Sequence, residues 1–171
     1  MQLELYVQEN FSEYSFDEGN IDEQIPIETW ENWFMQWMDI MNSDIPPASS
    51  YEVSLLLTND NEIQLLNSEY RQQNKPTDVL AFAALEVDYP QPINFPEPLP
   101  LCLGDIVVSM ETAFRQSIQQ GHSLKTELAW LTAHGFLHLI GWDHPDEESL
   151  VRMLNQQVIL LRSVDITIHL E

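Results

Sequence analysis

Residues 134–144 read HGFLHLIGWDH and hold three of the five histidines of the chain. His134 and His138 are four residues apart, so a helix would place both imidazoles on one face, one turn apart. Gly141 can adopt the left-handed conformation that ends a helix, after which the turning chain can bring His144 back to the other two. Three nitrogen ligands that leave a fourth position for water are typical of catalytic zinc sites. The sequence therefore predicts a central helix that carries two metal ligands, and one Zn(2+) per chain bound by His134, His138 and His144.

The spacing H-x3-H-x2-G-x2-H resembles the zinc-binding pattern of the metzincin proteases. Those enzymes carry a glutamate directly after the first histidine, where it acts as the general base. This chain has Gly135 at that position, and glycine has no group that can accept a proton. The ligand spacing of a protease is therefore present without the proteolytic base.

A closer resemblance takes in the complete string, which is similar to the HGxLHLxGYDH signature of the YbeY family of bacterial endoribonucleases and ribosomal RNA maturation factors. Two further segments agree in order and spacing. NSEYRQQNKPTDVLAF at 67–82 resembles the family's N-x2-YR…PTDVLSF segment, and LGDIVVS at 103–109 resembles its LGDI(V/I)IS segment. The resemblance covers about residues 50–162, and its two departures, Trp142 for tyrosine and Ala81 for serine, remove no ligand.

This resemblance implies a fold, an activity and partners. The implied fold is α/β (α+β) and zincin-like, with a small mixed four-stranded sheet packed with about five helices. The implied activity is that of a metal-dependent endoribonuclease, specific for single strands, which acts in maturation of small-subunit ribosomal RNA and in ribosome quality control. The expected partners are single-stranded RNA and the ribosome or small-subunit proteins, with no membrane and no DNA.

Two other functions remain open from the residues alone. A zinc metalloprotease-like hydrolase would need a glutamate or aspartate from elsewhere to replace the base that is missing at Gly135. A non-catalytic ribosome-assembly factor would use zinc only to hold two helices together.

Arg71 and Asp143 are the candidate catalytic residues beside the three histidines. Arg71 is the arginine of the YR pair in the resemblance, and its planar guanidinium suits a phosphate, although a structural salt bridge is the alternative. Asp143 directly precedes His144, so it could orient a histidine, accept a proton, or simply cap a turn. We expect Asp78 to support the loop that carries Arg71, and His122 to be solvated.

Composition sets limits on the class of protein. With 171 residues, the chain has the size of a single domain over 1–171. Cys102 is the only cysteine, which excludes an internal disulfide, and we expect a buried thiol. The absence of a basic, apolar leader and of any membrane-length apolar run indicates the cytoplasm.

The formal net charge of −22 opposes tight binding to naked RNA. All six basic residues lie at or after Arg71, so the first 70 residues contain no positive side chain. We expect the enzyme to reach RNA through a protein or ribosomal context, or with Mg²⁺ screening.

Periodicity and breaker residues predict the following elements. Strands are expected at 2–7, 51–58, 78–85 and 101–108, helices at 28–41, 61–70, 110–120, 123–141 and 145–162, and loops at 8–24 and 86–101. The continuous apolar run at 78–85 indicates a strand buried on both faces. Pro145 suits the first turn of the last helix, which would place His144 at the N-cap and Leu150, Leu154, Val158 and Leu161 inward.

Overall fold

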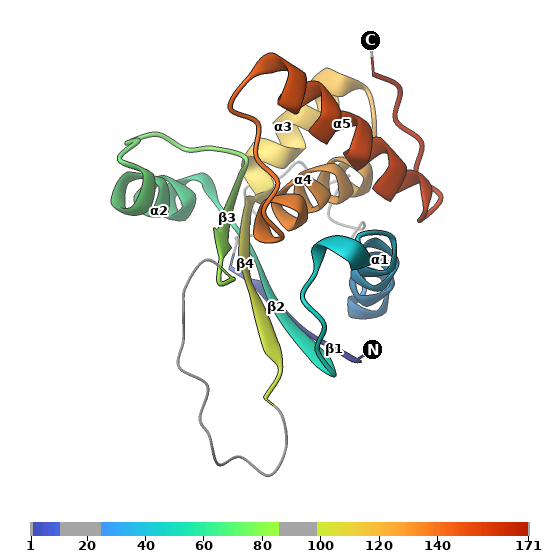
Figure 1. The fold of residues 1–171 in the computed structure, drawn as a ribbon. Coiled ribbons are helices and arrows are strands. Elements are labelled where there is room, and N and C mark those ends of the chain that lie inside the picture. Colours follow the sequence, from blue (N-terminus) through green and yellow to red (C-terminus); the bar gives the residue numbers. More distant parts are fainter. Residues whose placement is uncertain (1, 11–24, 86–98, 171) are drawn as a thin grey trace.

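In the computed structural model the described residues are 2–10, 25–85 and 99–170 (Figure 1). Their elements follow the order β1 (Gln2–Glu9), α1 (Ile27–Ile40), the short 3-10 helix η2 (Asn42–Asp44), β2 (Ser50–Thr58), α2 (Asp60–Arg71), β3 (Val79–Ala83), β4 (Leu101–Ser109), α3 (Met110–Gln120), α4 (Leu124–Leu139) and α5 (Glu147–Arg162). The predicted mixed α/β fold, with one four-stranded sheet and five α-helices, is therefore confirmed over these residues.

The sheet has the strand order β1-β2-β4-β3. β1, β2 and β4 run parallel, whereas β3 pairs antiparallel with β4 and lies at the edge. The register between β2 and β4 shifts near Glu52 and Val53, which leaves Leu103 as the extra residue of a β-bulge. Gly104 follows with φ +133, and a Cβ there would lie 2.1 Å from the Phe82 carbonyl oxygen. Glycine at this position therefore allows β3 to pair closely with β4.

Helices lie on both faces of the sheet, and α4, which carries His134 and His138, covers one of them. Val53, Leu55 and Ile106 of the sheet are buried in one core with α1 and α4. The tryptophan-rich face of α1 lies in that core. On the opposite face, Ile63 of α2 packs with Leu80 and Val107 in a second, smaller cluster. Figure 1 shows α2 on the other side of the sheet from α1 and α4.

Side chains at the helix ends explain several boundaries. Asn59, Ser109 and Ser123 each accept a backbone N–H of the first turn of the helix that follows, which satisfies a donor that the helix leaves unpaired. Gly121 ends α3 with φ +74, and Gly141 follows α4 with φ +102. Because a left-handed residue ends a helix, these two glycines stop α3 and α4 where the sequence predicted.

Three predictions about burial and boundaries are wrong. β3 is an edge strand of which only Leu80 is buried, since it pairs on one side alone. Cys102 is exposed, because its side chain points outward at the start of β4. Where the two predicted loops fall on described residues, Gln8 and Glu9 continue β1 and Leu101 begins β4; residues 11–24 and 86–98 lie outside the described residues.

The start and the buried face of α5 also differ from the prediction. Asp146 is the N-cap, because its carboxylate accepts the Ser149 N–H while the Ser149 hydroxyl accepts the Asp146 N–H. This reciprocal capping box places Pro145 and His144 before the helix. Leu161 is buried as expected, but Leu150, Leu154 and Val158 are half-buried, and Met153, Gln157 and Leu160 form the rest of the buried face. None of the helices in the described ranges is long and apolar enough to cross a membrane.

Candidate metal centre

The structure brings the three histidines together at the end of α4. His134 and His138 lie one turn apart on that helix, and His144 lies in the turn before α5. The ring centroids are 4.6 Å apart for His134 and His138, 5.4 Å for His134 and His144, and 5.2 Å for His138 and His144. Each ring offers one nitrogen, and these three atoms all lie within 4.8 Å of one another. Of the described residues, this is the group that could hold a metal ion.

The nitrogen separations fit a single small metal ion. The Nε2 atoms of His134 and His138 are 3.1 Å apart. Two nitrogens bound to one tetrahedral zinc at about 2.0–2.1 Å would be about 3.3 Å apart. The existing arrangement therefore needs only a small adjustment to hold zinc, and it contains no anionic ligand.

A short turn positions His144. The Trp142 N–H donates to the Leu137 carbonyl over 2.9 Å, and the Trp142 indole N–H donates to Asp44 over 3.1 Å. The Asp143 carboxylate accepts the His144 backbone N–H over 2.8 Å. These bonds direct the chain back toward α4 after Gly141, so that His144 faces the other two rings.

Burial keeps the helical histidines in the neutral form that binds metals. Desolvation lowers the pKa of His134, an effect opposed by its hydrogen bond with Gln157. Desolvation, with the neighbouring His134 and His144, lowers the pKa of His138 to about 4, although Asp143 acts in the opposite direction. Because the proton and a metal compete for the same nitrogen, a lowered pKa favours metal binding at neutral pH.

Gly135 lets α4 lie close against the sheet beside its first ligand. It is buried, and a Cβ at this position would lie 2.8 Å from Cγ2 of Ile106 and 3.4 Å from Cγ2 of Val79. The sequence showed only that a proteolytic glutamate is missing here. The structure adds that the sheet occupies the space such a side chain would need.

The histidines line a cleft of about 740 Å³ between α4, the turn before α5 and strand β3. Arg71, the last residue of α2, lines the same cleft from across β3. The full lining is Arg71, Asp78, Val79, Leu80, Ala81, Phe82, Ala83, His134, Gly135, His138, Gly141, Trp142, Asp143 and His144. All five site residues predicted from the sequence thus line one cavity.

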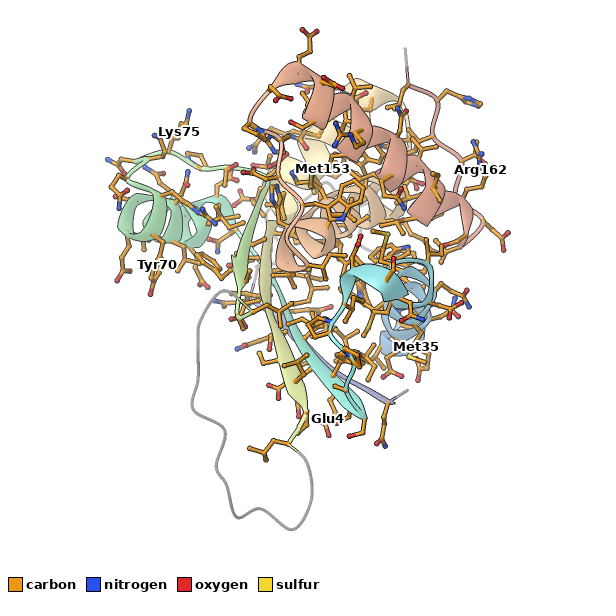
Figure 2. All side chains as sticks on the ribbon, in the orientation of Figure 1. Glu4, Met35, Tyr70, Lys75, Met153 and Arg162 are labelled. Atoms are coloured by element: carbon orange, nitrogen blue, oxygen red, sulfur yellow. The ribbon has the colours of Figure 1, made fainter. Side chains whose placement is uncertain are left out.

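A hydrogen bond and a ring contact hold Arg71 in place. Its Nη2 donates to the Ala81 carbonyl over 2.8 Å, and its guanidinium carbon lies 5.8 Å from the centroid of the Phe82 ring. Arg71 is exposed and forms no salt bridge within the described residues. The structural salt bridge that the sequence left open is therefore not found there, and the charge faces the cleft. Lys75 is exposed in the loop after α2 (Figure 2).

Asp78 and Asp143 add negative charge to the wall of the cleft. Asp78 accepts the Val79 N–H over 2.7 Å and the Gln116 side-chain N–H over 3.3 Å, which anchors the start of β3. Asp143 both anchors the His144 turn and acts electrostatically on His138. Asp143 therefore both stabilises the turn that carries His144 and acts electrostatically to raise the pKa of His138.

Two features of the site region were missed from the sequence. Gln157 of α5 lies fully buried with its Oε1 2.9 Å from Nδ1 of His134, although a glutamine on a helix carries no sequence signal for such a role. His122, predicted to be solvated, instead pairs through Nε2 with the buried carboxylate of Glu127. Burial raises the pKa of Glu127, and the pairing with His122 opposes that rise. His169 is exposed.

A mixed α/β fold with a three-histidine cluster and an arginine in one cleft defines a candidate metal-dependent hydrolase. Comparison with known proteins narrows this class. The family model for the endoribonuclease YbeY matches residues 16–165. The chain therefore belongs to the YbeY family of endoribonucleases.

Individual relatives agree with this assignment. The chain is 61% identical over 175 residues to an endoribonuclease YbeY of Trichormus variabilis, covering 99% of this chain and 98% of that protein. It is 60% identical over 174 residues to one of a Nostoc species, covering 99% of this chain and 94% of that protein. A solution structure from Thermotoga maritima shares the fold with a TM-score of 0.55 at 22% identity, covering 94% of this chain and 89% of that one.

Proposed function

We propose that this protein is a zinc-dependent endoribonuclease that cuts single-stranded RNA in the cleft between α4 and β3. The observation that carries the proposal is the placement of three histidines at metal-ligand distances, together with one arginine that forms no salt bridge among the described residues, in the walls of a single cavity. His134, His138 and His144 would hold the metal in a zincin-like site, and Arg71 would bind the phosphate.

The donor set determines what the metal would contribute. A zinc ion held by three neutral imidazoles keeps its full charge, so it would lower the pKa of a bound water toward about 7 and polarise a phosphoryl oxygen. The lowered pKa of His134 and His138 keeps these side chains available as ligands at neutral pH. Asp143 at the cleft wall is a candidate acceptor for a proton, from water or from the 2′-OH of RNA.

Arg71 would supply a positively charged contact for a phosphate within this acidic chain. Its guanidinium already donates one N–H to Ala81, and its remaining donors are free to form a bidentate contact with a phosphate. The hydrogen bond and the Phe82 ring fix its position before RNA arrives, so less side-chain entropy is lost on binding.

With a net charge of −22, we further propose that the enzyme reaches ribosomal RNA through a ribosomal or small-subunit protein context in the cytoplasm, with residues 1–171 acting as one domain. In that context its reaction would serve maturation and quality control of small-subunit RNA. A steep salt dependence of binding to naked RNA would contradict this route.

The packing at Gly135 leaves no room for a base at that position, because a Cβ there would lie 2.8 Å from Cγ2 of Ile106. The protease alternative therefore requires an acidic residue from elsewhere in the cleft, and casein cleavage tests it. The assembly-factor alternative remains a matter for experiment. It predicts that loss of Arg71 or His138 leaves RNA cleavage at background while the cellular role survives.

The test compares the wild-type protein with His134→Ala and with the matched control His169→Ala, in which an exposed histidine outside the site is removed. Bound metal is measured by elemental analysis, and cleavage is measured on single- and double-stranded RNA and on casein. We expect about one zinc per chain and cleavage of single-stranded RNA in wild type and control, both lost in His134→Ala. Equal RNA cleavage by wild type and His134→Ala would indicate a contaminating nuclease and refute the enzyme at this site. A wild-type protein without bound metal would refute the metal assignment.

A further inference from the structure

Gln157 is a polar side chain in the most buried part of α5. It is 0% exposed and lies on the same helix face as Met153, Leu160 and Leu161, all of them buried. An amide taken from water into such surroundings costs free energy unless both of its polar ends are hydrogen-bonded. The position would suit an aliphatic side chain if packing were its only role.

Both ends of the Gln157 amide have partners on α4. Its Nε2 donates to the Trp130 carbonyl oxygen over 3.3 Å, and its Oε1 lies 2.9 Å from Nδ1 of His134. The Trp130 carbonyl can only accept, so the amide nitrogen must be the end that faces it. The oxygen is then the end that faces the histidine, and this oxygen can only accept.

The protonation of the His134 ring follows from this arrangement. Since Gln157 presents an acceptor, Nδ1 of His134 must carry the hydrogen, and in the neutral ring Nε2 then has the free lone pair. Nε2 is also the atom that lies 3.1 Å from Nε2 of His138, on the side where the three rings converge. The Trp130 carbonyl thus determines the orientation of the Gln157 amide, and this orientation determines which nitrogen of His134 carries the hydrogen.

We propose that Gln157 is a positioning residue for the metal centre: its buried carbonyl holds His134 as the Nδ1–H tautomer and directs Nε2 to the metal position. This inference rests on the proposed metal site and adds a residue from a different helix to it. Partners of this kind orient a ligand ring, and their loss typically weakens metal affinity by about 10–100-fold.

The position of Gln157 also connects α5 to the site. His134 lies on α4, whereas His144 lies in the turn that precedes α5, so the proposed ligands come from two segments of the chain. Gln157 on α5 contacts His134 on α4, although the two residues are 23 positions apart in sequence. The orientation of the first ligand therefore depends on α5 being docked.

The first test is the tautomer of His134 in the full-length, metal-free protein at neutral pH, read from imidazole nitrogen chemical shifts by NMR. We expect the proton on Nδ1. A wild-type ring that carries its proton on Nε2 would overturn the proposal, whatever any variant does.

The second test uses Gln157→Met, which keeps the side-chain length but removes the amide, and Gln157→Glu, which keeps an oxygen acceptor. The matched control is Gln156→Met, because the neighbouring Gln156 donates to the sulfur of Met41 rather than to the site. The zinc dissociation constant is measured by competition with a chromophoric chelator, and the melting temperature of each metal-free protein is recorded.

We expect Gln157→Met to bind zinc about 10–100-fold more weakly and to lose the fixed His134 tautomer, with Gln157→Glu recovering most of the affinity and Gln156→Met unchanged. Equal zinc affinity in Gln157→Met and wild type would overturn the proposal. A variant with a lower melting temperature but wild-type affinity would show a purely structural role, which also overturns it. If the wild-type protein binds no zinc, the metal site itself fails, and the tautomer measurement still decides the role of Gln157.

Discussion

Gly135→Ala measures how closely α4 is packed on the sheet at the metal centre. In an unconstrained helix interior, replacing glycine by alanine stabilises by about 1 kcal/mol. Here the added Cβ would lie 2.8 Å from Cγ2 of Ile106, closer than an ordinary contact. Ile106 is 0% exposed and β-branched, so its side chain has little freedom to move aside.

The two effects oppose each other with different magnitudes. Overpacking a core costs about 1–3 kcal/mol, and subtracting the helix gain leaves a net loss of about 0–2 kcal/mol. We therefore expect Gly135→Ala to lower the free energy of unfolding by about 1 kcal/mol, measured as a shift of the urea midpoint at an unchanged slope. The displaced helix should also weaken zinc binding, because His134 is the adjacent residue.

A double-mutant cycle separates the contact from the helix effect. Ile106→Ala removes the atom that Gly135→Ala would contact, at its own cost of about 2–5 kcal/mol. In that background the alanine should stabilise by about 1 kcal/mol, giving a coupling of about 2 kcal/mol between the two positions. If Gly135→Ala stabilises the wild type and the Ile106→Ala protein equally, the close packing inferred at this helix is refuted.

Three further predictions concern the phosphate contact, protonation and a helix end. Arg71→Ala should reduce kcat/KM on single-stranded RNA by about 10²–10³-fold. Arg71→Lys should recover little of this activity, because lysine lacks the planar guanidinium that can form two hydrogen bonds with a phosphate, and Lys75→Ala serves as the control. Near-wild-type cleavage by Arg71→Ala would exclude Arg71 as the phosphate contact. In the metal-free protein, the pKa of about 4 for His138 lies below its ordinary 6.5, so the unfolded chain takes up this proton first as the pH falls. Stability relative to His138→Gln should therefore fall between about pH 6.5 and pH 4 and change no further below that, and a pH-independent difference in urea midpoints would contradict the lowered pKa. Asp146→Ala removes the N-cap of α5 and should lower the free energy of unfolding by about 1 kcal/mol. The control Glu147→Ala, which changes the next residue, should lower it clearly less. Equal effects of the two substitutions in thermal unfolding would argue against the capping box.

Local signals in the sequence accounted for most helix boundaries. Asn59, Ser109 and Ser123 cap the helices that were predicted to follow them, and Gly141 follows the end of the ligand-bearing helix. These signals succeed because a cap or a left-handed residue acts on its own neighbours in the chain. The same reasoning failed at Pro145, where the Asp146–Ser149 capping box determined the start of α5.

Burial was predicted less well where it depended on a partner element. The apolar composition of 78–85 suggested a central strand, yet β3 has a neighbour on one side only. His122 was expected to be solvated, but it pairs with the buried carboxylate of Glu127 on α4. An apolar or polar residue type does not reveal which element will cover it.

The chain alone determined the central features of this protein: the ligand spacing of His134 and His138 on one helix face, the helix end at Gly141, and the family that HGFLHLIGWDH and its two companion segments indicate. Helical periodicity and glycine conformation operate over a few residues, so they can be read directly from the order of residues. Only the tertiary structure placed Arg71 in the same cleft as the histidines, Gly135 in close contact with Ile106, and Gln157 beside His134. Those contacts join residues far apart in the chain, and they exist because the sheet order and the docking of α4 and α5 bring these segments together.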